Sequence, residues 1–148
     1  MPPFIAGGEY FELLFWGGGH VLQFTHTQLM LVAWLWLASV SAVPVYTGPR
    51  VVLFLFAWGL LAVFATPVIY LAFDVNSIEH RRLFTWQMEF GGSLASLWIG
   101  LALLAGLVKA DAAPPHARAE RAALTTSVLL FGIGGVIGFL ISGSNVTV

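Results

Sequence analysis

Four long apolar segments, separated by short polar stretches, dominate the 148-residue chain. They run from about Tyr10 to Val43, from Val51 to Phe73, from about Leu83 to Val108 and from about Ala122 to Ser142. A helix needs roughly 20 apolar residues to cross a hydrocarbon core of about 30 Å, and each segment is long enough. The pattern therefore predicts an all-α, polytopic membrane bundle in which four transmembrane helices form a single transmembrane domain.

The polar stretches between the segments carry loop signals and the basic residues. Pro44 and TGPR end the first segment, DVNSIEHRR separates the second from the third, and KADAAPPHARAER separates the third from the fourth. The first and third stretches hold four basic residues, against two in the second: Arg50, Lys109, Arg118 and Arg121, against Arg81 and Arg82. Basic residues concentrate on the cytoplasmic side, so we expect both termini to lie outside.

Composition narrows the chemistry that this chain can perform. Hydrophobic residues make up 59% of it and charged residues only 9%, which is typical of polytopic membrane proteins. The net charge is −1, so nothing suggests nucleic acid as a partner. The absence of cysteine excludes disulfides, thiolate zinc sites and cysteine-ligated iron–sulfur clusters.

The stretch FWGGGHVLQF, residues 15–24, places three glycines and a histidine inside the first apolar segment. Counted from Glu9 at the outer end, His20 lies 11 residues in, or about 16 Å at 1.5 Å per residue. Counted from His80, Glu89 lies nine residues in, or about 13 Å. An ionisable residue at membrane depth is a functional candidate, which makes His20 and Glu89 the leading site residues.

Helical spacing groups the polar and small residues onto faces. One face of the first segment holds Trp16, His20, Gln23 and Thr27, and one face of the third holds Thr85, Glu89, Gly92, Ser96 and Gly100. In the fourth segment Gly134 and Gly138 have the same spacing, for which tight helix packing is the simpler explanation. These faces are expected to point at protein, at a cofactor or at a small wet cavity.

Other residues have ordinary structural interpretations. Trp34, Trp36 and Trp98 are expected to be lipid-facing or interfacial aromatics. His80 and His116 fall in the predicted loops and are expected to be solvated. His26 is six residues from His20 and points elsewhere, so it is interpreted as a helix–helix hydrogen bonder.

Three stretches resemble the catalytic subunit I of the heme–copper oxidase superfamily (cytochrome c or quinol oxidase polypeptide I), especially its nitric-oxide-reductase-like branch. FWGGGHVLQF is similar to the sixth helix of that subunit, which supplies a histidine ligand of the copper centre. LLFGIGGVIGFLISGSN is similar to the ninth helix, and FDVNSIEHRRLFTWQM to the outer loop that enters the eighth. The resemblance implies that the chain is a fragment of a twelve-helix subunit, covering helices six to nine.

The resemblance implies a metal site at His20. His20 would be a ligand of copper or non-heme iron opposite a heme iron, since imidazole suits either metal. Trp16, Gly19 and Gln23 would lie on the cofactor side, with Gln23 orienting His20 or its metal. Gly17 to Gly19 would let a partner helix or the heme edge come close.

The chain also departs from the family. The adjacent histidine pair of the next helix falls on Thr66 and Pro67, and the tyrosine that follows the ligand histidine in common oxygen reductases is Phe24. Glu89 has roughly the spacing of a glutamate that lines the metal site of nitric oxide reductases, and Tyr70 could face the same cavity. His20 with Glu89 would then define an altered site, with Glu89 and Tyr70 as catalytic residues.

The heme axial histidines of the family lie on its second and tenth helices, and this chain stops at SGSNVTV. We therefore expect part of a respiratory oxidoreductase of a bacterial or archaeal cytoplasmic membrane that reduces nitric oxide or oxygen. Its partners would be the remaining helices of subunit I, and cytochrome c or quinol as electron donor. The alternative is a stand-alone, non-catalytic four-helix membrane protein that binds a metal or heme, or an assembly subunit.

Overall fold

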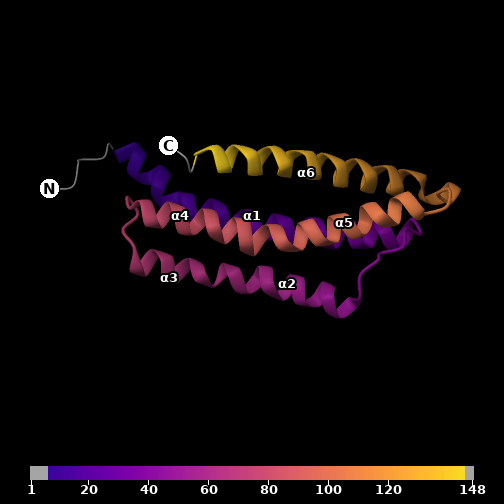
Figure 1. The fold of residues 1–148 in the computed structure, drawn as a ribbon, viewed down its shortest axis with the longest axis horizontal. Coiled ribbons are helices and arrows are strands. Elements are labelled where there is room, and N and C mark those ends of the chain that lie inside the picture. Colours follow the sequence, from indigo (N-terminus) through magenta and orange to yellow (C-terminus); the bar gives the residue numbers. More distant parts are fainter. Residues whose placement is uncertain (1–6, 146–148) are drawn as a thin grey trace. The chain divides into compact units, whose positions relative to one another are not determined.

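The computed structural model describes residues 7–145, and within this range every regular element is a helix (Figure 1). In chain order the elements are α1 (Gly7–Val40), α2 (Pro49–Val63), α3 (Ala65–Ala72), α4 (Ile78–Trp86), the π-helix η1 (Gln87–Gly92), α5 (Ser93–Lys109), the short 3₁₀-helix η2 (Pro115–Ala117) and α6 (Arg118–Asn145). Residues 146–148, the end of the SGSNVTV stretch, and the side chain of Glu9 lie outside the described part.

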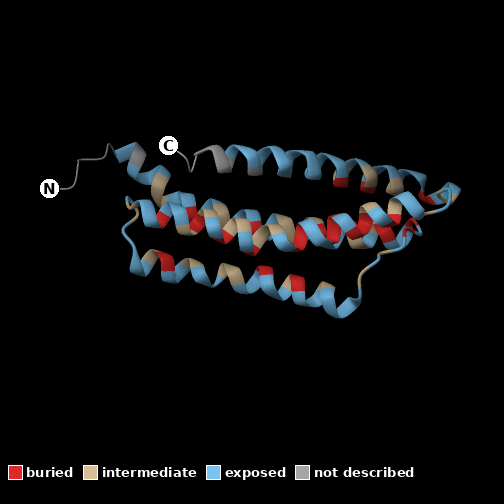
Figure 2. Ribbon diagram, in the orientation of Figure 1, coloured by how far each residue is buried: buried red, intermediate tan, exposed pale blue. Residues whose placement is uncertain are grey.

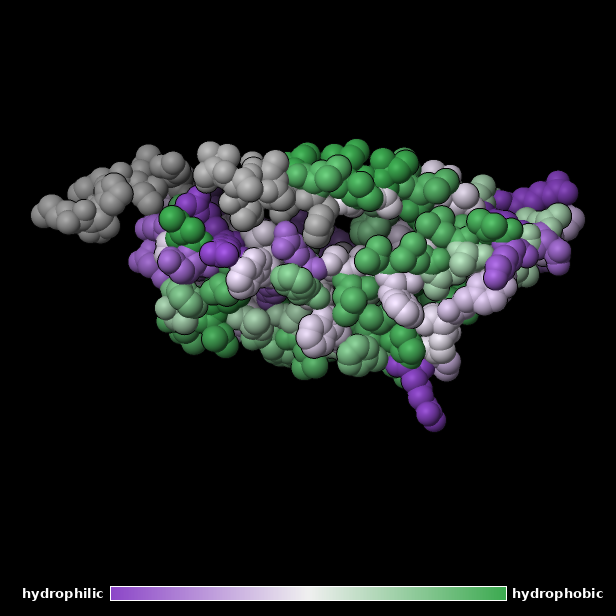
Figure 3. Space-filling view, viewed as in Figure 1, coloured by the Kyte–Doolittle hydropathy of each residue, from purple (hydrophilic) through white to green (hydrophobic). Residues whose placement is uncertain are grey.

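Four stretches of helix are long and apolar enough to cross a membrane, which confirms the predicted all-α class and the four membrane-length helices. They are Tyr10–Val40, Pro49–Ala72, Ile78–Lys109 and Pro115–Gly138. Figure 3 shows hydrophobic side chains over much of the visible surface of these helices and hydrophilic ones toward the α5–α6 connection. This distribution suits a chain whose helix sides contact lipid or other apolar helices.

Local chemistry sets two helix ends that the hydrophobic pattern placed elsewhere. The third long helix begins at Ile78 rather than near Leu83, because the Ser77 hydroxyl caps it by accepting a hydrogen bond from the His80 amide at 3.1 Å. The first helix ends at Val40 rather than Val43. There Ala42 adopts a left-handed φ of 54° that turns the chain out of the helix.

The second long helix is interrupted at Phe64, between α2 and α3. Pro67 has no amide hydrogen, and its ring crowds the carbonyl of Val63 four residues earlier. The Phe64 amide instead donates to the Leu61 carbonyl at 3.1 Å, a tighter turn than an α-helix makes. The interruption leaves backbone carbonyls available to side chains of neighbouring helices.

The chain divides into two compact units. The first unit comprises the residues up to Met30 together with Pro49–Ser96, and the second comprises Leu31–Gly48 and the chain from Leu97 onward. Helices α1 and α5 each contribute to both units. All the leading candidate site residues, including His20, Tyr70 and Glu89, belong to the first unit.

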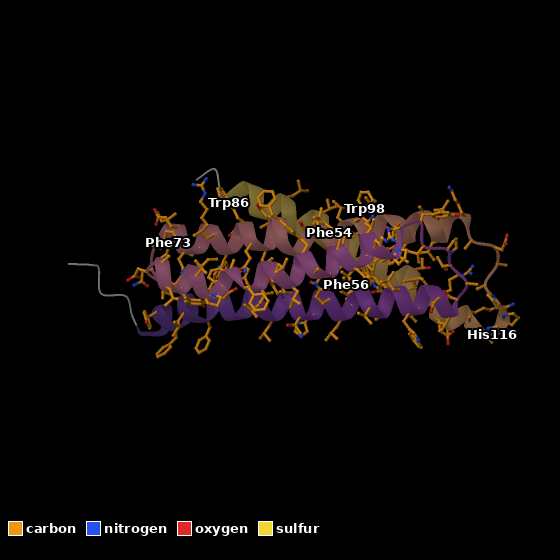
Figure 4. The ribbon with its side chains drawn as sticks, turned by 90° about the horizontal axis from the view of Figure 1, so that it is seen from below. Phe54, Phe56, Phe73, Trp86, Trp98 and His116 are labelled. Atoms are coloured by element: carbon orange, nitrogen blue, oxygen red, sulfur yellow. The ribbon has the colours of Figure 1, made fainter. Side chains whose placement is uncertain are left out.

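Trp34 anchors the core of the second unit. It is only 2% exposed, and its indole nitrogen donates a hydrogen bond to the Ser127 hydroxyl at 2.8 Å. The lipid-facing prediction is therefore wrong for Trp34, because its polar edge has a partner on α6. Trp36 and Trp98 are exposed as expected; Trp98 is labelled in Figure 4. The Trp98 indole nitrogen donates a hydrogen bond to the Thr47 hydroxyl at 3.2 Å.

Replacing Trp34 with phenylalanine should lower the stability of the second unit measurably. The change removes the bond to Ser127, worth about 1 kcal/mol, and leaves a small cavity. Trp36→Phe is the matched control, because Trp36 is exposed and its loss should change little. Thermal unfolding of the three proteins in one detergent tests this, and equal midpoints for both variants would contradict it.

The glycines of α6 do not make the close helix contacts that their spacing predicted. A Cβ atom added at Gly134 or Gly138 would meet no atom within 4 Å, and Figure 2 shows the described part of this region as exposed. The prediction that these two glycines pack tightly against another helix is wrong within the described residues. The close approach of the second unit occurs instead at Gly106, where a side chain would collide with the Pro44 carbonyl.

Candidate functional site

His20 has a fixed orientation on α1. Its Nδ1 atom lies 2.7 Å from the carbonyl oxygen of Trp16, one turn earlier. A backbone carbonyl only accepts hydrogen bonds, so this contact assigns the proton to Nδ1 and leaves the lone pair on Nε2. The side chain is half-buried. Such an arrangement is common in histidines that bind metals, where the second nitrogen is held by a carbonyl.

His20 belongs to a chain of ring contacts that links α1, α3 and α4, and we call these rings, with Gly17, the His20 cluster. Its members are Trp16, Gly17 and His20 of α1, Tyr70 of α3, and His80 and Phe84 of α4. The His20 ring centroid lies 4.9 Å from that of Trp16 and 5.9 Å from that of Phe84. Phe84 in turn lies 5.5 Å from Tyr70 and 5.0 Å from His80. The cluster is therefore one continuous packed group.

Gly17 allows these helices to approach α1. A Cβ atom at Gly17 would collide with the Tyr70 hydroxyl and the ring of Phe84. A Cβ atom at Gly18 or Gly19 would meet nothing within 4 Å. Only Gly17 of the three thus has a packing reason within the described chain, and Gly19 on the expected cofactor side is exposed.

Tyr70 connects α3 to α1 through a hydrogen bond. Its hydroxyl donates a hydrogen bond to the Leu14 carbonyl at 2.6 Å, and its ring lies 4.9 Å from that of His80. The structure therefore brings Tyr70 into the His20 cluster, although Phe84 and Gly17 lie between it and His20. Its hydroxyl is committed to α1, which favours a supporting role.

His80 differs most from its interpretation as a solvated loop residue. It lies in the first turn of α4 and is 0% exposed, and neither ring nitrogen has a hydrogen bond of good geometry to any described residue. The Phe73 carbonyl and the Asp74 carboxylate lie nearby, and the rings of Tyr70 and Phe84 pack edge-on against it. The signal that could have placed it correctly is Ser77, a helix N-cap three residues earlier. His116 is exposed, as expected, in the α5–α6 connection (Figure 4).

Glu89 lies in the π-helix η1 and is half-buried. A π-turn adds a residue to the helical repeat, so it displaces the face predicted for residues 85–100 from ideal α-helical spacing. Gly91, rather than Gly92, makes the close approach, because a Cβ atom there would collide with Ala62. Segments of π-helix are frequent at functional sites, and this one carries the acidic residue that the sequence singled out.

Gln23, predicted on the cofactor side, is exposed. His26, interpreted as a helix–helix hydrogen bonder, is also exposed, and Phe24 is buried with its ring against Gly91 and Gly92. At the position of the family's histidine pair, Thr66 accepts a hydrogen bond from Gln87 at 3.0 Å and Pro67 is exposed. Phe24 therefore contributes to helix packing, and Thr66 contributes a hydrogen-bond acceptor beside the α2–α3 break.

A metal at His20 would need donors from outside the described residues. Among them no group of three or more His, Cys, Asp or Glu side chains is placed to hold a metal ion. One imidazole with a free Nε2 fits the role of a single ligand and not of a whole site.

The chain is similar to two bacterial proteins of unassigned function. It is 29% identical to an uncharacterized protein of Rickettsia prowazekii (strain Madrid E) over 101 residues, which is 67% of this chain and 19% of that protein. It is 28% identical to an uncharacterized protein of Aquifex aeolicus (strain VF5) over 141 residues, 95% of this chain and 33% of that protein. The chain thus spans about a fifth and a third of these relatives. No protein-family model and no solved structure matched.

Proposed function

We propose that this chain is part of the catalytic subunit of a membrane respiratory oxidoreductase. That enzyme reduces nitric oxide or oxygen at a heme and a second metal, copper or non-heme iron, and takes electrons from cytochrome c or quinol. The observation that carries the proposal is the geometry of His20. Its Nδ1 is anchored on the Trp16 carbonyl, its Nε2 is open, and it lies about 16 Å into an apolar helix by rise per residue.

The incomplete donor set supports a site shared with other helices. His20 offers one nitrogen, and the described residues contain no group of three or more His, Cys, Asp or Glu side chains that could hold a metal ion. The remaining ligands, and those of the heme iron, would come from the remaining helices of the subunit. The greater length of both relatives agrees with this arrangement. The heme would supply the electron and the site for the gas, while this chain orients His20.

Glu89 and Tyr70 have different roles in this proposal. Glu89 lies on a half-buried π-helix within the same unit as His20, which suits a carboxylate beside a metal or a proton-accepting group. Tyr70 contacts Gly17 and Phe84, and so would position the site without touching the metal. The alternative is that the chain is a non-catalytic membrane protein or an assembly subunit. The packing of Tyr70, His80 and Phe84 against one another is equally compatible with that alternative.

The test is to purify the protein that contains this chain from its native membranes in mild detergent. The proposal predicts heme bands, a second metal near one per protein, and consumption of nitric oxide or oxygen with a reduced donor. Mass spectrometry of the same sample gives the full polypeptide and its partners. A preparation free of heme and of copper and iron would overturn the proposal and leave the assembly subunit.

Residues 1–148 expressed alone with heme supplied should insert in the membrane but bind no heme tightly. The family's axial histidines are not in this chain, and a heme held by packing alone should be lost in purification. An absorption spectrum in mild detergent measures this. A stoichiometric Soret band with a sharp reduced α-band would contradict the fragment hypothesis and make His20 or His26 a heme ligand.

A further inference from the structure

The first unit contains a second polar group, built on two glutamines and separate from the His20 cluster. Gln87 of η1 donates through Nε2 to the Ala62 carbonyl at 2.6 Å and to the Thr66 hydroxyl at 3.0 Å. Gln28 of α1 donates through Nε2 to the carbonyl of Phe56 at 3.3 Å; Phe56 is labelled on α2 in Figure 4. Both carboxamides therefore reach the backbone of the α2–α3 helix from its neighbours.

The oxygen atoms of these two carboxamides are buried without a donor. Neither Oε1 of Gln28 nor Oε1 of Gln87 accepts a hydrogen bond from any described residue, and Gln87 is only 9% exposed. Rotating either amide by 180° does not help, because its oxygen would then face a backbone carbonyl, which has no proton to donate. The carbonyls of Phe56 and Ala62 therefore fix both orientations. A buried carboxamide oxygen is expected to find a donor, because leaving it unpaired is costly.

Among the described residues no donor reaches either oxygen. Gly59 lies against the Gln28 amide, and the Gln87 amide lies at the Ala62 carbonyl. A Cβ atom at Gly59 would collide with the Gln28 amide, and one at Gly91 would collide with Ala62. Backbone amides in these helices are engaged within their own helices. A small molecule that can both donate and accept hydrogen bonds is needed.

We infer that the buried carboxamide oxygens of Gln28 and Gln87 each bind an internal water in the first unit. Buried waters typically make about three hydrogen bonds to polar groups that otherwise lack partners. Gln28 lies 18 residues after Tyr10 and 12 before Val40, so it is about 18 Å or more from either end of its span. It also lies eight residues, or about 12 Å, from His20 along α1. The water at Gln28 is therefore within the membrane-length region and independent of the metal proposal.

The test is water-edited solid-state NMR of the protein in lipid bilayers, with glutamine, asparagine and isoleucine side chains labelled. The chain has three glutamines, at positions 23, 28 and 87, so the spectrum is simple to assign. Magnetisation should pass from water to the side-chain amides of Gln28 and Gln87 about as fast as to Asn76, which is exposed between α3 and α4. Transfer as slow as that to the buried methyls of Ile69 would overturn the inference.

A variant shows whether the magnetisation that reaches the amides comes from bound water or from spin diffusion through neighbouring side chains. Gln87→Met keeps the length of the side chain and removes its polar atoms, so the rapid transfer at Gln28 should persist if it comes from a water bound by Gln28 itself, and its loss would contradict separate waters. Transfer to Asn76 should be unchanged. If this variant fails to fold, the wild-type transfer rates alone decide the question.

Discussion

Replacing His20 with alanine in the complete protein should abolish turnover and remove the second metal. His20 supplies an imidazole whose Nε2 is open and whose Nδ1 is held by the Trp16 carbonyl. Losing a ligand should cost more than the 10–100-fold that loss of an outer partner typically costs. The spectrum of the proposed low-spin heme should stay intact, because the proposal places its ligands outside this chain. Metal analysis, optical spectra and turnover on one preparation measure all three effects.

His26→Ala is the matched control for this experiment. His26 lies on the same helix, six residues from His20, and is exposed. It should retain full metal content and turnover. If His20→Ala kept its metal and activity, or if both variants lost them equally, His20 would not be the ligand. The ligand of the second metal would then lie in another part of the protein.

Replacing Gly17 with leucine should destabilise the first unit and disturb His20 as well. A side chain there must displace the Tyr70 hydroxyl, which is bonded to Leu14, and the ring of Phe84, which is 0% exposed. Overpacking of this kind typically costs about 1–3 kcal/mol. Because Phe84 packs against the His20 ring, metal binding should weaken together with stability. Thermal unfolding in detergent and metal analysis measure the two effects.

Gly18→Leu separates this clash from a general effect of leucine in α1. A Cβ atom at Gly18 meets nothing within 4 Å, and leucine favours a helix over glycine by somewhat less than about 1 kcal/mol. Gly18→Leu should therefore be neutral or stabilising within the chain. If both variants unfolded at the same temperature, Gly17 would not be the contact that admits α3 and α4.

The fold class could be read from the sequence because lipid demands long, uninterrupted apolar helices. The details that failed depend on local hydrogen bonds that hydropathy does not report. Ser77 extends the third long helix to Ile78, and Ala42 ends the first at Val40. The π-turn at Gln87–Gly92 is invisible to an argument that assumes 3.6 residues per turn. It moves the close approach from Gly92 to Gly91.

The candidate site was predictable only in part. Depth and glycine spacing pointed to His20, and the structure supplies the reason for Gly17 but for neither Gly18 nor Gly19. His80 was missed because its charge-rich neighbours in DVNSIEHRR suggested a loop. Its burial depends on Tyr70 and Phe84, which are ten residues before it and four after it in the sequence. Contacts between helices of this kind follow from packing and not from local composition.

The most direct test of the account is electron paramagnetic resonance of the second metal in the complete protein labelled with ¹⁵N-histidine. The account predicts a hyperfine coupling from a directly bound histidine nitrogen that disappears in His20→Ala and persists in His26→Ala. It also predicts that Nε2, and not Nδ1, is the bound atom, because Nδ1 is engaged by Trp16. A metal signal with unchanged nitrogen couplings in His20→Ala would contradict the central claim.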